Sequence, residues 1–101
     1  MNKVQLQFTE GGRGAFFITE NGIRLAEMDI SISPGHLTAY HTEVAPEAEG
    51  RGLAKEMLLA MTAYAREKGL KVNPLCPYVL TQFKRHPEAY ADLWQLPHPK
   101  A

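Results

Sequence analysis

The chain has 101 residues, of which 45% are hydrophobic and 22% charged, with 11 basic and 11 acidic side chains. This composition is typical of a globular protein and argues against disorder, and the balanced charge carries no electrostatic signature of a nucleic-acid or membrane partner. We therefore expect one domain over residues 1–101 and no partner of either kind.

The first half of the chain alternates apolar and polar residues, which is the pattern of β-strands. Asn21-Gly22 is a strong hairpin signal, because both residues tolerate positive φ. The apolar positions change phase between Leu25 and Met28, which predicts a bulge near Ala26-Glu27. We expect an antiparallel meander of four strands, at residues 4–8, 15–19, 23–32 and 37–44.

The second half begins with a helical pattern from Gly52 to Lys68, and Gly69 provides a stop. A short apolar strand is expected at residues 70–75. A second helix is expected over Pro77–Arg85, with proline at its first position. His86-Pro87 interrupts it, and one or two further turns are expected in residues 87–94.

The resulting order, β-β-β-β-α-β-α, predicts an α/β (α+β) fold with a mixed sheet. A helix between the fourth and fifth strands makes a right-handed crossover, so these two strands are expected to pair in parallel. A ligand site is then expected where the fourth strand leads into the helix.

Cys76 is the only cysteine, so a disulfide within the chain is impossible and a reducing compartment is the simplest interpretation. The N-terminal residues alternate and do not resemble a signal peptide. The most apolar segment, MLLAMTAYA, is much shorter than the roughly 18 residues of a membrane helix. A cytoplasmic location is expected.

The segment EAEGRGLA, residues 47–54, has two glycines around Arg51 directly before a helix. Unpaired amides and the helix dipole favour an anion at such a place, and Gly50 and Gly52 allow close approach. Glu47 and Glu49 oppose an anion if they point inward. The alternative is a plain loop that only begins a helix.

Several other side chains could carry chemistry. His41 and Glu43 share one face of a strand and could act as a general base or bind an amine, or could simply be an exposed polar face. Cys76, at a helix N-cap, could have a lowered pKa or be a small buried residue. Tyr78 could donate a proton or pack as an aromatic, and His86 could pair with Cys76 or cap a helix.

One metal motif is incomplete. Zinc deaminases carry H-x-E followed by P-C-x-x-C. Here His41-Thr42-Glu43 is followed by Pro74-Leu75-Cys76-Pro77 without a second cysteine, so no metal site is expected.

Three segments carry a family resemblance: HTEVAPEAEGRGLAKEML, GLKVNPLCPYV and RHPEAYADLW. Together they resemble the small single-domain members of the GNAT superfamily, the acetyl-CoA-dependent N-acetyltransferases. The element order matches over nearly the whole chain, and the specific motifs span Tyr40 to Trp94. The N-terminal helices that larger members use to build an acceptor groove have no counterpart in these residues.

The resemblance implies a coenzyme A site where the fourth and fifth strands splay apart. The glycine loop would bind the pyrophosphate through backbone amides, and the fourth strand would run beside the pantetheine arm. Glu47 replaces the usual Gln or Arg of the motif, and Glu49 replaces a frequently basic residue. The residues implied to contact the coenzyme are Thr42, Glu43, Val44, Gly50, Arg51, Gly52, Leu53 and Ala54.

The expected function is transfer of acetyl from acetyl-CoA to an unidentified amine, either a small molecule or a protein lysine or N-terminus. Glu43 or His41 would deprotonate the amine, and Cys76 or Tyr78 would protonate the departing thiolate. Covalent transfer through Cys76 is a less favoured route, because a ternary complex needs no intermediate. The alternatives are a non-catalytic acyl-CoA-binding or sensing module and a Cys76-His86 hydrolase. The protein is expected to be a monomer or a weak dimer.

Overall fold

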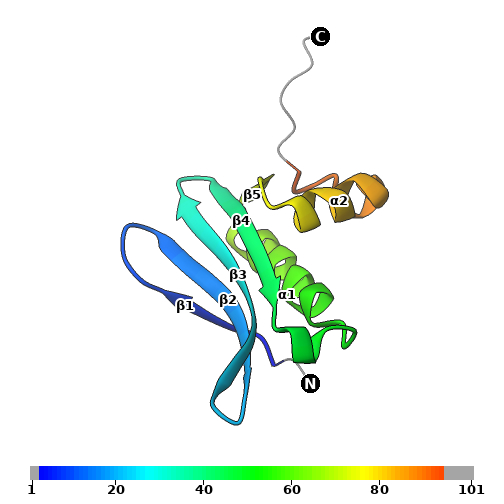
Figure 1. The fold of residues 1–101 in the computed structure, drawn as a ribbon. Coiled ribbons are helices and arrows are strands. Elements are labelled where there is room, and N and C mark those ends of the chain that lie inside the picture. Colours follow the sequence, from blue (N-terminus) through cyan, green and yellow to red (C-terminus); the bar gives the residue numbers. More distant parts are fainter. Residues whose placement is uncertain (1–2, 95–101) are drawn as a thin grey trace.

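The computed structural model describes residues 3–94, which form a five-stranded sheet and its helices (Figure 1). The elements follow the order expected from the sequence, with one addition, the short 3-10 helix η1. Their bounds are β1 Gln5–Phe8, β2 Arg13–Glu20, β3 Ile23–Ser33, β4 His36–Val44, η1 Pro46–Ala48, α1 Leu53–Lys68, β5 Lys71–Pro74, α2 Pro77–Arg85 and α3 Pro87–Tyr90.

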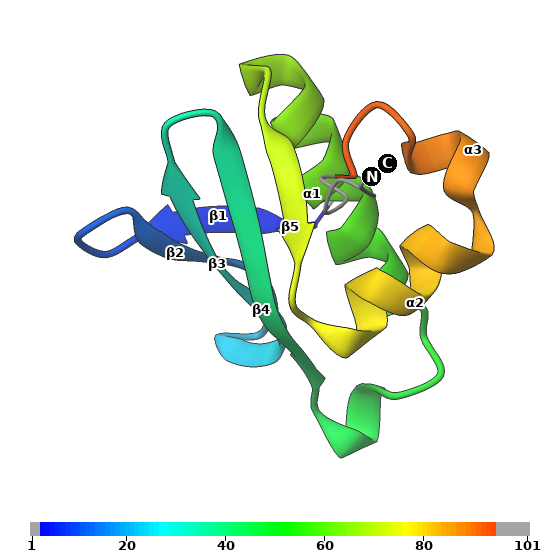
Figure 2. The same ribbon diagram turned by 90° about the horizontal axis from the view of Figure 1, so that it is seen from above.

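The sheet has the strand order β1-β2-β3-β4-β5. The first four strands are antiparallel and β5 is parallel to β4, as the meander and the crossover helix predicted. Figure 2 shows the helices on one side of the sheet, and the core confirms this, because Val79 and Phe83 of α2 join the same buried cluster as Met57 and Met61 of α1. The other face of the sheet carries no helix in the described part of the chain.

The hairpin between β2 and β3 turns at Asn21 and Gly22, which have φ values of 53° and 78°. This agrees with the Asn-Gly signal, since a two-residue turn of this kind needs positive φ at both positions. The register shifts between Ile18 and Thr19, so Leu25 is the extra residue of β3. The expected bulge is therefore confirmed, one residue earlier than Ala26-Glu27.

A second register shift, which the sequence did not predict, lies in β4. Asp29 of β3 pairs with His41 but Ile30 pairs with Ala39, so Tyr40 is the extra residue. A bulge of this kind leaves one residue unpaired and bends the strand. It changes the side-chain alternation of β4 just before His41.

Strands β4 and β5 pair only from His36–Lys71 to Ala39–Pro74. The amide of Cys76 then donates to the Ala39 carbonyl at 2.8 Å, and the chain turns into α2. Pro74 has no N–H with which to extend the ladder. Beyond Ala39 the edge of β4 therefore has no strand partner on that side, as expected for a splayed pair.

Helix α1 is positioned by one apolar stripe and two glycine ends. Gly52 and Gly69 flank it with φ values of 79° and 70°, and its buried face fills the space over the sheet. Burying each large apolar side chain stabilises a fold by about 1.5–3 kcal/mol relative to exposure. The buried residues of this stripe are Leu53, Met57, Leu58, Met61, Thr62 and Ala65.

The C-terminal part of the described chain closes the outer edge of β5. The Val72 amide donates to the Leu93 carbonyl at 2.7 Å. Phe83 stacks on Tyr90 with ring centroids 4.5 Å apart and meets the edge of Trp94 at 5.8 Å. These contacts fix α2 and α3 against the sheet.

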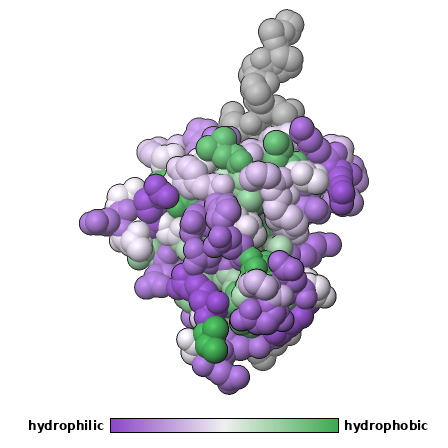
Figure 3. Space-filling model, in the orientation of Figure 1, coloured by the Kyte–Doolittle hydropathy of each residue, from purple (hydrophilic) through white to green (hydrophobic). Residues whose placement is uncertain are grey.

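Exposed apolar side chains are scattered. Figure 3 shows small apolar groups separated by hydrophilic surface on the face in view. Among the described residues, no helix is long and apolar enough to span a membrane.

Candidate functional site

The loop between η1 and α1 is built on two glycines in the left-handed region, Gly50 with φ 87° and Gly52 with φ 79°. Residues with a side chain rarely adopt these backbone angles, so the conformation of the loop favours glycine at both positions. A Cβ at either position would meet no heavy atom within 4 Å. The space above the loop is therefore open to a ligand.

The loop also presents free amides. Within residues 3–94, the amides of Gly50, Arg51 and Gly52 donate to no backbone carbonyl. The first turn of α1 adds N–H groups that have no partner inside the helix, and the helix dipole places partial positive charge there. Such a loop and helix end can bind an anion.

A cavity of about 360 Å³ lies over this loop. Its walls come from the end of β4, the loop itself, the first turn of α1 and α2. The lining residues are Val44, Ala48, Glu49, Gly50, Gly52, Leu53, Ala54, Lys55 and Tyr78. Five of the residues expected to contact the coenzyme are among them: Val44, Gly50, Gly52, Leu53 and Ala54.

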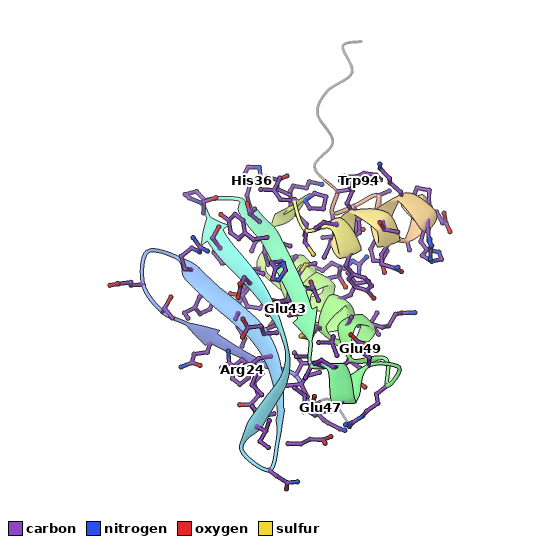
Figure 4. The ribbon with its side chains drawn as sticks, in the orientation of Figure 1. Arg24, His36, Glu43, Glu47, Glu49 and Trp94 are labelled. Carbon is purple, nitrogen blue, oxygen red and sulfur yellow. The ribbon has the colours of Figure 1, made fainter. Side chains whose placement is uncertain are left out.

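Charges of both signs border the cavity. Lys55, in the first turn of α1, lines the cavity. It was not identified from the sequence, although a basic residue about one turn after the two glycines indicates a cation beside the loop. Glu49 also lines the cavity, whereas Glu47 does not. Figure 4 shows Glu49 beside the start of α1 and Glu47 on η1. Of the two loop acids, Glu49 is the one positioned to oppose an anion.

The side chain of Arg51 points away from this cavity, to the end of β2. Its guanidinium donates two hydrogen bonds to the Glu20 carboxylate, one of them 3.3 Å long. Lys3 donates to the same carboxylate at 3.2 Å. The Arg51 guanidinium and, secondarily, Lys3 lower the pKa of Glu20 to about 2. Arg51 therefore contributes its backbone, and not its charge, to the cavity.

The open edge of β4 runs on from this cavity. The Ala45 amide donates to Leu25 of β3 at 2.8 Å. Because backbone groups alternate along a strand, the N–H and C=O of Glu43 also face β3, while those of Thr42 and Val44 face the edge that β5 leaves open. Thr42 and Val44 are thus the residues whose main chain an extended ligand could pair with.

Cys76 lies at the N-cap of α2, beside this edge. Its side chain is 1% exposed, and its Sγ lies 3.1 Å from the Thr42 hydroxyl oxygen. Tyr78, the second residue of α2, is half-buried, and burial raises the pKa of its phenol above the usual range. Its phenol is protonated at neutral pH, as that of an ordinary tyrosine is, and so carries a proton that it can donate.

His41 and Glu43 lie on the other face of the sheet. The His41 Nε2 and Glu43 Oε2 atoms are 3.3 Å apart, and their side chains are 54% and 68% exposed. Thr42, between them, points to Cys76, and neighbouring strand residues point to opposite faces. The pair therefore stands on the open face, away from α1.

Further acids surround this pair on β3. Glu27 is registered opposite Glu43, and Asp29 opposite His41. Burial and the nearby Glu27 raise the pKa of Asp29. A second cavity, of about 370 Å³, is lined by Glu27, Glu43 and the chain from Arg24 to Ala26 and from Val44 to Pro46. The open face thus has a hollow beside Glu43.

The four expected catalytic residues therefore form two pairs, with β4 between them. Cys76 and Tyr78 are on the helix side, and His41 and Glu43 are on the open face. His86 is exposed at the C-terminal end of α2, the opposite end from Cys76. A nine-residue helix is about 13 Å long, so the structure does not bring Cys76 and His86 together. Within residues 3–94 no three His, Cys, Asp or Glu side chains cluster to hold a metal.

Comparison with known protein families gives one family model, described as GCN5-related N-acetyl-transferase, which matches residues 15–93. No curated protein sequence matches the chain.

Solved structures share the fold. A GCN5-like protein from Staphylococcus aureus, solved by NMR, is 25% identical, covers 99% of this chain and 97% of its own, and superposes with a TM-score of 0.68. The ribosomal-protein-alanine N-acetyltransferase of Brucella melitensis biovar Abortus 2308 is 15% identical, with coverages of 91% and 68% and a TM-score of 0.61. The aminoglycoside N-acetyltransferase AAC(6')-Iy, in complex with CoA, is 19% identical, with coverages of 89% and 72% and a TM-score of 0.54.

Proposed function

The chain belongs to the GCN5-related N-acetyltransferase family, and from this premise we propose that it transfers the acetyl group of acetyl-CoA to an amine. The observation that carries the proposal is the glycine loop: its amides donate to no backbone carbonyl, and Gly50 and Gly52 line a cavity that also reaches Val44 on the free edge of β4. A fold relative of this chain has been crystallised with CoA, which supports this choice of acyl donor.

In this proposal the coenzyme diphosphate lies over Gly50–Ala54. The amides there supply hydrogen bonds, and Lys55 supplies the positive charge. The pantetheine arm, an extended chain with amide groups, pairs with the main chain of Thr42 and Val44 in the way that a peptide adds to a sheet edge. This arrangement leads the thioester toward Cys76.

The reaction forms an N–C bond to the acceptor amine and breaks the C–S bond of the thioester. Glu43, with His41 beside it, takes the amine proton on the open face. The main chain of the β4 edge polarises the thioester carbonyl. Tyr78 or Cys76 returns a proton to the departing thiolate.

A second candidate is a module that binds acyl-CoA without catalysis. The burial of Cys76 and its contact with Thr42 favour it, because they give the thiol a packing role and leave no donor beside the thioester except Tyr78. In this case the acids of the open face are a solvated surface.

The test is a turnover assay with acetyl-CoA and a panel of small amines, lysine peptides and peptide N-termini. Coenzyme A release that requires an amine, with the acetyl-amine product found by mass spectrometry, supports the transferase. Tight binding without release supports the module. Thioester loss without any amine would indicate hydrolysis and contradict both.

A further inference from the structure

We propose that Glu20 is a positioning residue for the glycine loop between η1 and α1. From the end of β2 it binds Arg51 and so holds the loop in the conformation that leaves its amides open to a ligand. The inference rests on the proposed function, since it assigns a role within that coenzyme site. It adds a residue that lies 31 positions from Arg51 in the sequence and belongs to no motif of the family resemblance.

The loop needs such a support. Gly50 and Gly52 flank Arg51, and glycine has more backbone freedom to lose than any other residue. Backbone hydrogen bonds tie η1 up to Glu49 and resume with the Glu56 amide bonding the Gly52 carbonyl. Between those points, the Arg51 side chain is the tie that the described structure provides. Gly52 as N-cap offers no side chain to close the first turn.

The contact is well suited to that task. Two guanidinium nitrogens meet two carboxylate oxygens, an arrangement that fixes direction as well as distance. Lys3 joins the same carboxylate, so Glu20 also ties the segment before β1 to the loop. Arg51 and Glu20 thus neutralise each other's charge, and Lys55 is the cation among the residues that line the cavity.

Two possible roles for Arg51 predict opposite changes in the coenzyme A affinity of the Glu20→Gln variant. If Glu20 positions the loop, Glu20→Gln loosens it and weakens coenzyme A. If Arg51 is instead a phosphate ligand that Glu20 holds back, Glu20→Gln frees it and tightens coenzyme A. Exposed ion pairs contribute little, so a change of only roughly threefold in Kd is expected.

The first experiment is calorimetric titration of coenzyme A into wild type, Glu20→Gln, Arg51→Gln and the double variant. We expect each single variant to raise Kd about threefold and the double variant to add nothing further, since one tie is lost in all three. Glu10→Gln, on the exposed turn between β1 and β2, makes the same change in net charge and should leave Kd unchanged. A tighter or unchanged Glu20→Gln, or additive single effects, would overturn the proposal.

The second experiment needs no coenzyme. Backbone ¹⁵N relaxation should give lower order parameters in Glu20→Gln at residues 50–52, with those along Met57–Ala65 unchanged. Unchanged order parameters in the loop would contradict the positioning role. If wild type binds no coenzyme A but the loop still loosens, the proposed function fails while the role of Glu20 in the loop stands.

Discussion

The thiol of Cys76 illustrates how burial narrows the roles of a residue. It is enclosed at the start of α2 and touches the Thr42 hydroxyl beside the open edge of β4. The pairing with His86 that a hydrolase needs is absent from the structure, because the two residues cap opposite ends of α2. A proton-donor role, shared with Tyr78, fits this position better than that of an activated nucleophile.

We expect Cys76→Ala and Cys76→Ser to keep partial activity, with kcat lowered about 10- to 100-fold, because Tyr78 or water can supply the proton. Cys76→Ala should also lower the free energy of unfolding by about 1 kcal/mol. Steady-state kinetics against pH and chemical denaturation check these values. Stoichiometric acetyl on Cys76 in protein quenched during turnover would contradict the assignment and establish a covalent route.

Glu20 gives a prediction in the acid range. Its pKa is about 2 when folded, against a usual value of 4.5. A carboxyl with a lowered folded pKa stabilises the folded state above its unfolded pKa, and this contribution is lost as the pH falls from about 4.5 through about 2. NMR titration of the side-chain carboxyl carbon should give a midpoint near 2, and Arg51→Gln should move it up toward the usual range. An unmoved midpoint would mean that Arg51 is not its main partner in solution.

At the scale of elements, the glycine loop and the first turn of α1 form the proposed anion-binding unit. The unit depends on backbone conformation, because Gly50 and Gly52 line the cavity without side chains and their amides donate to no backbone carbonyl. Helix α1 offers its own control, since glycines with nearly equal φ stand at both of its ends, Gly52 beside the cavity and Gly69 far from it.

Gly52→Ala and Gly69→Ala should each lower the free energy of unfolding by about 1 kcal/mol, the cost of a side chain at positive φ. Only Gly52→Ala should weaken coenzyme A, because the strained loop withdraws its amides. Denaturation curves and calorimetric titration measure the two quantities. Equal coenzyme A affinities in the two folded variants would show that the loop does not contribute to coenzyme binding.

The charges on this unit are expected to act in opposite directions. Lys55→Gln should weaken coenzyme A and Glu49→Gln should tighten it, each by a factor that shrinks as salt rises. Glu47→Gln is the matched control, because Glu47 does not line the cavity. Titrations at low and high salt test this, and a salt-independent change would mean that these side chains shape the loop instead.

For the whole molecule, the main consequence of the fold is that β4 separates two surfaces. Its free edge and α2 form the side proposed for the coenzyme, and its open face carries His41 and Glu43 beside a hollow of about 370 Å³. An acceptor that approaches this face would meet the acyl group at the unpaired edge of the strand. Donor and acceptor sites are therefore expected to be separable by mutation.

Glu43→Gln should lower kcat/KM for the amine by about 10²-fold at neutral pH and leave the Kd of coenzyme A unchanged. The control is Glu27→Gln, since Glu27 is the registered neighbour of Glu43 and carries the same charge on the same face. An equal loss of kcat/KM in both variants would show that the negative charge of this face supports the reaction and that Glu43 does not act as the base.

Local sequence signals determined the elements of this protein. Asn21-Gly22 specifies a turn, Gly52 and Gly69 bound a helix, and Pro77 begins another, because each acts through the backbone of its own neighbourhood. The strand order followed from the same signals together with the handedness of crossovers. The glycine loop could be recognised for the same reason, since its amides belong to consecutive residues.

Only the tertiary structure decided which side chains share a site. The Arg51–Glu20 and Cys76–Thr42 contacts join residues 31 and 34 positions apart, and they depend on sheet register and on how α2 leaves β5. The unpredicted bulge at Tyr40 changes the side-chain phase of β4, so it determines that Thr42 faces Cys76 while His41 and Glu43 face the open side. A one-residue shift of phase moves side chains to the other face of a sheet, and residue types alone do not specify where an extra residue is placed.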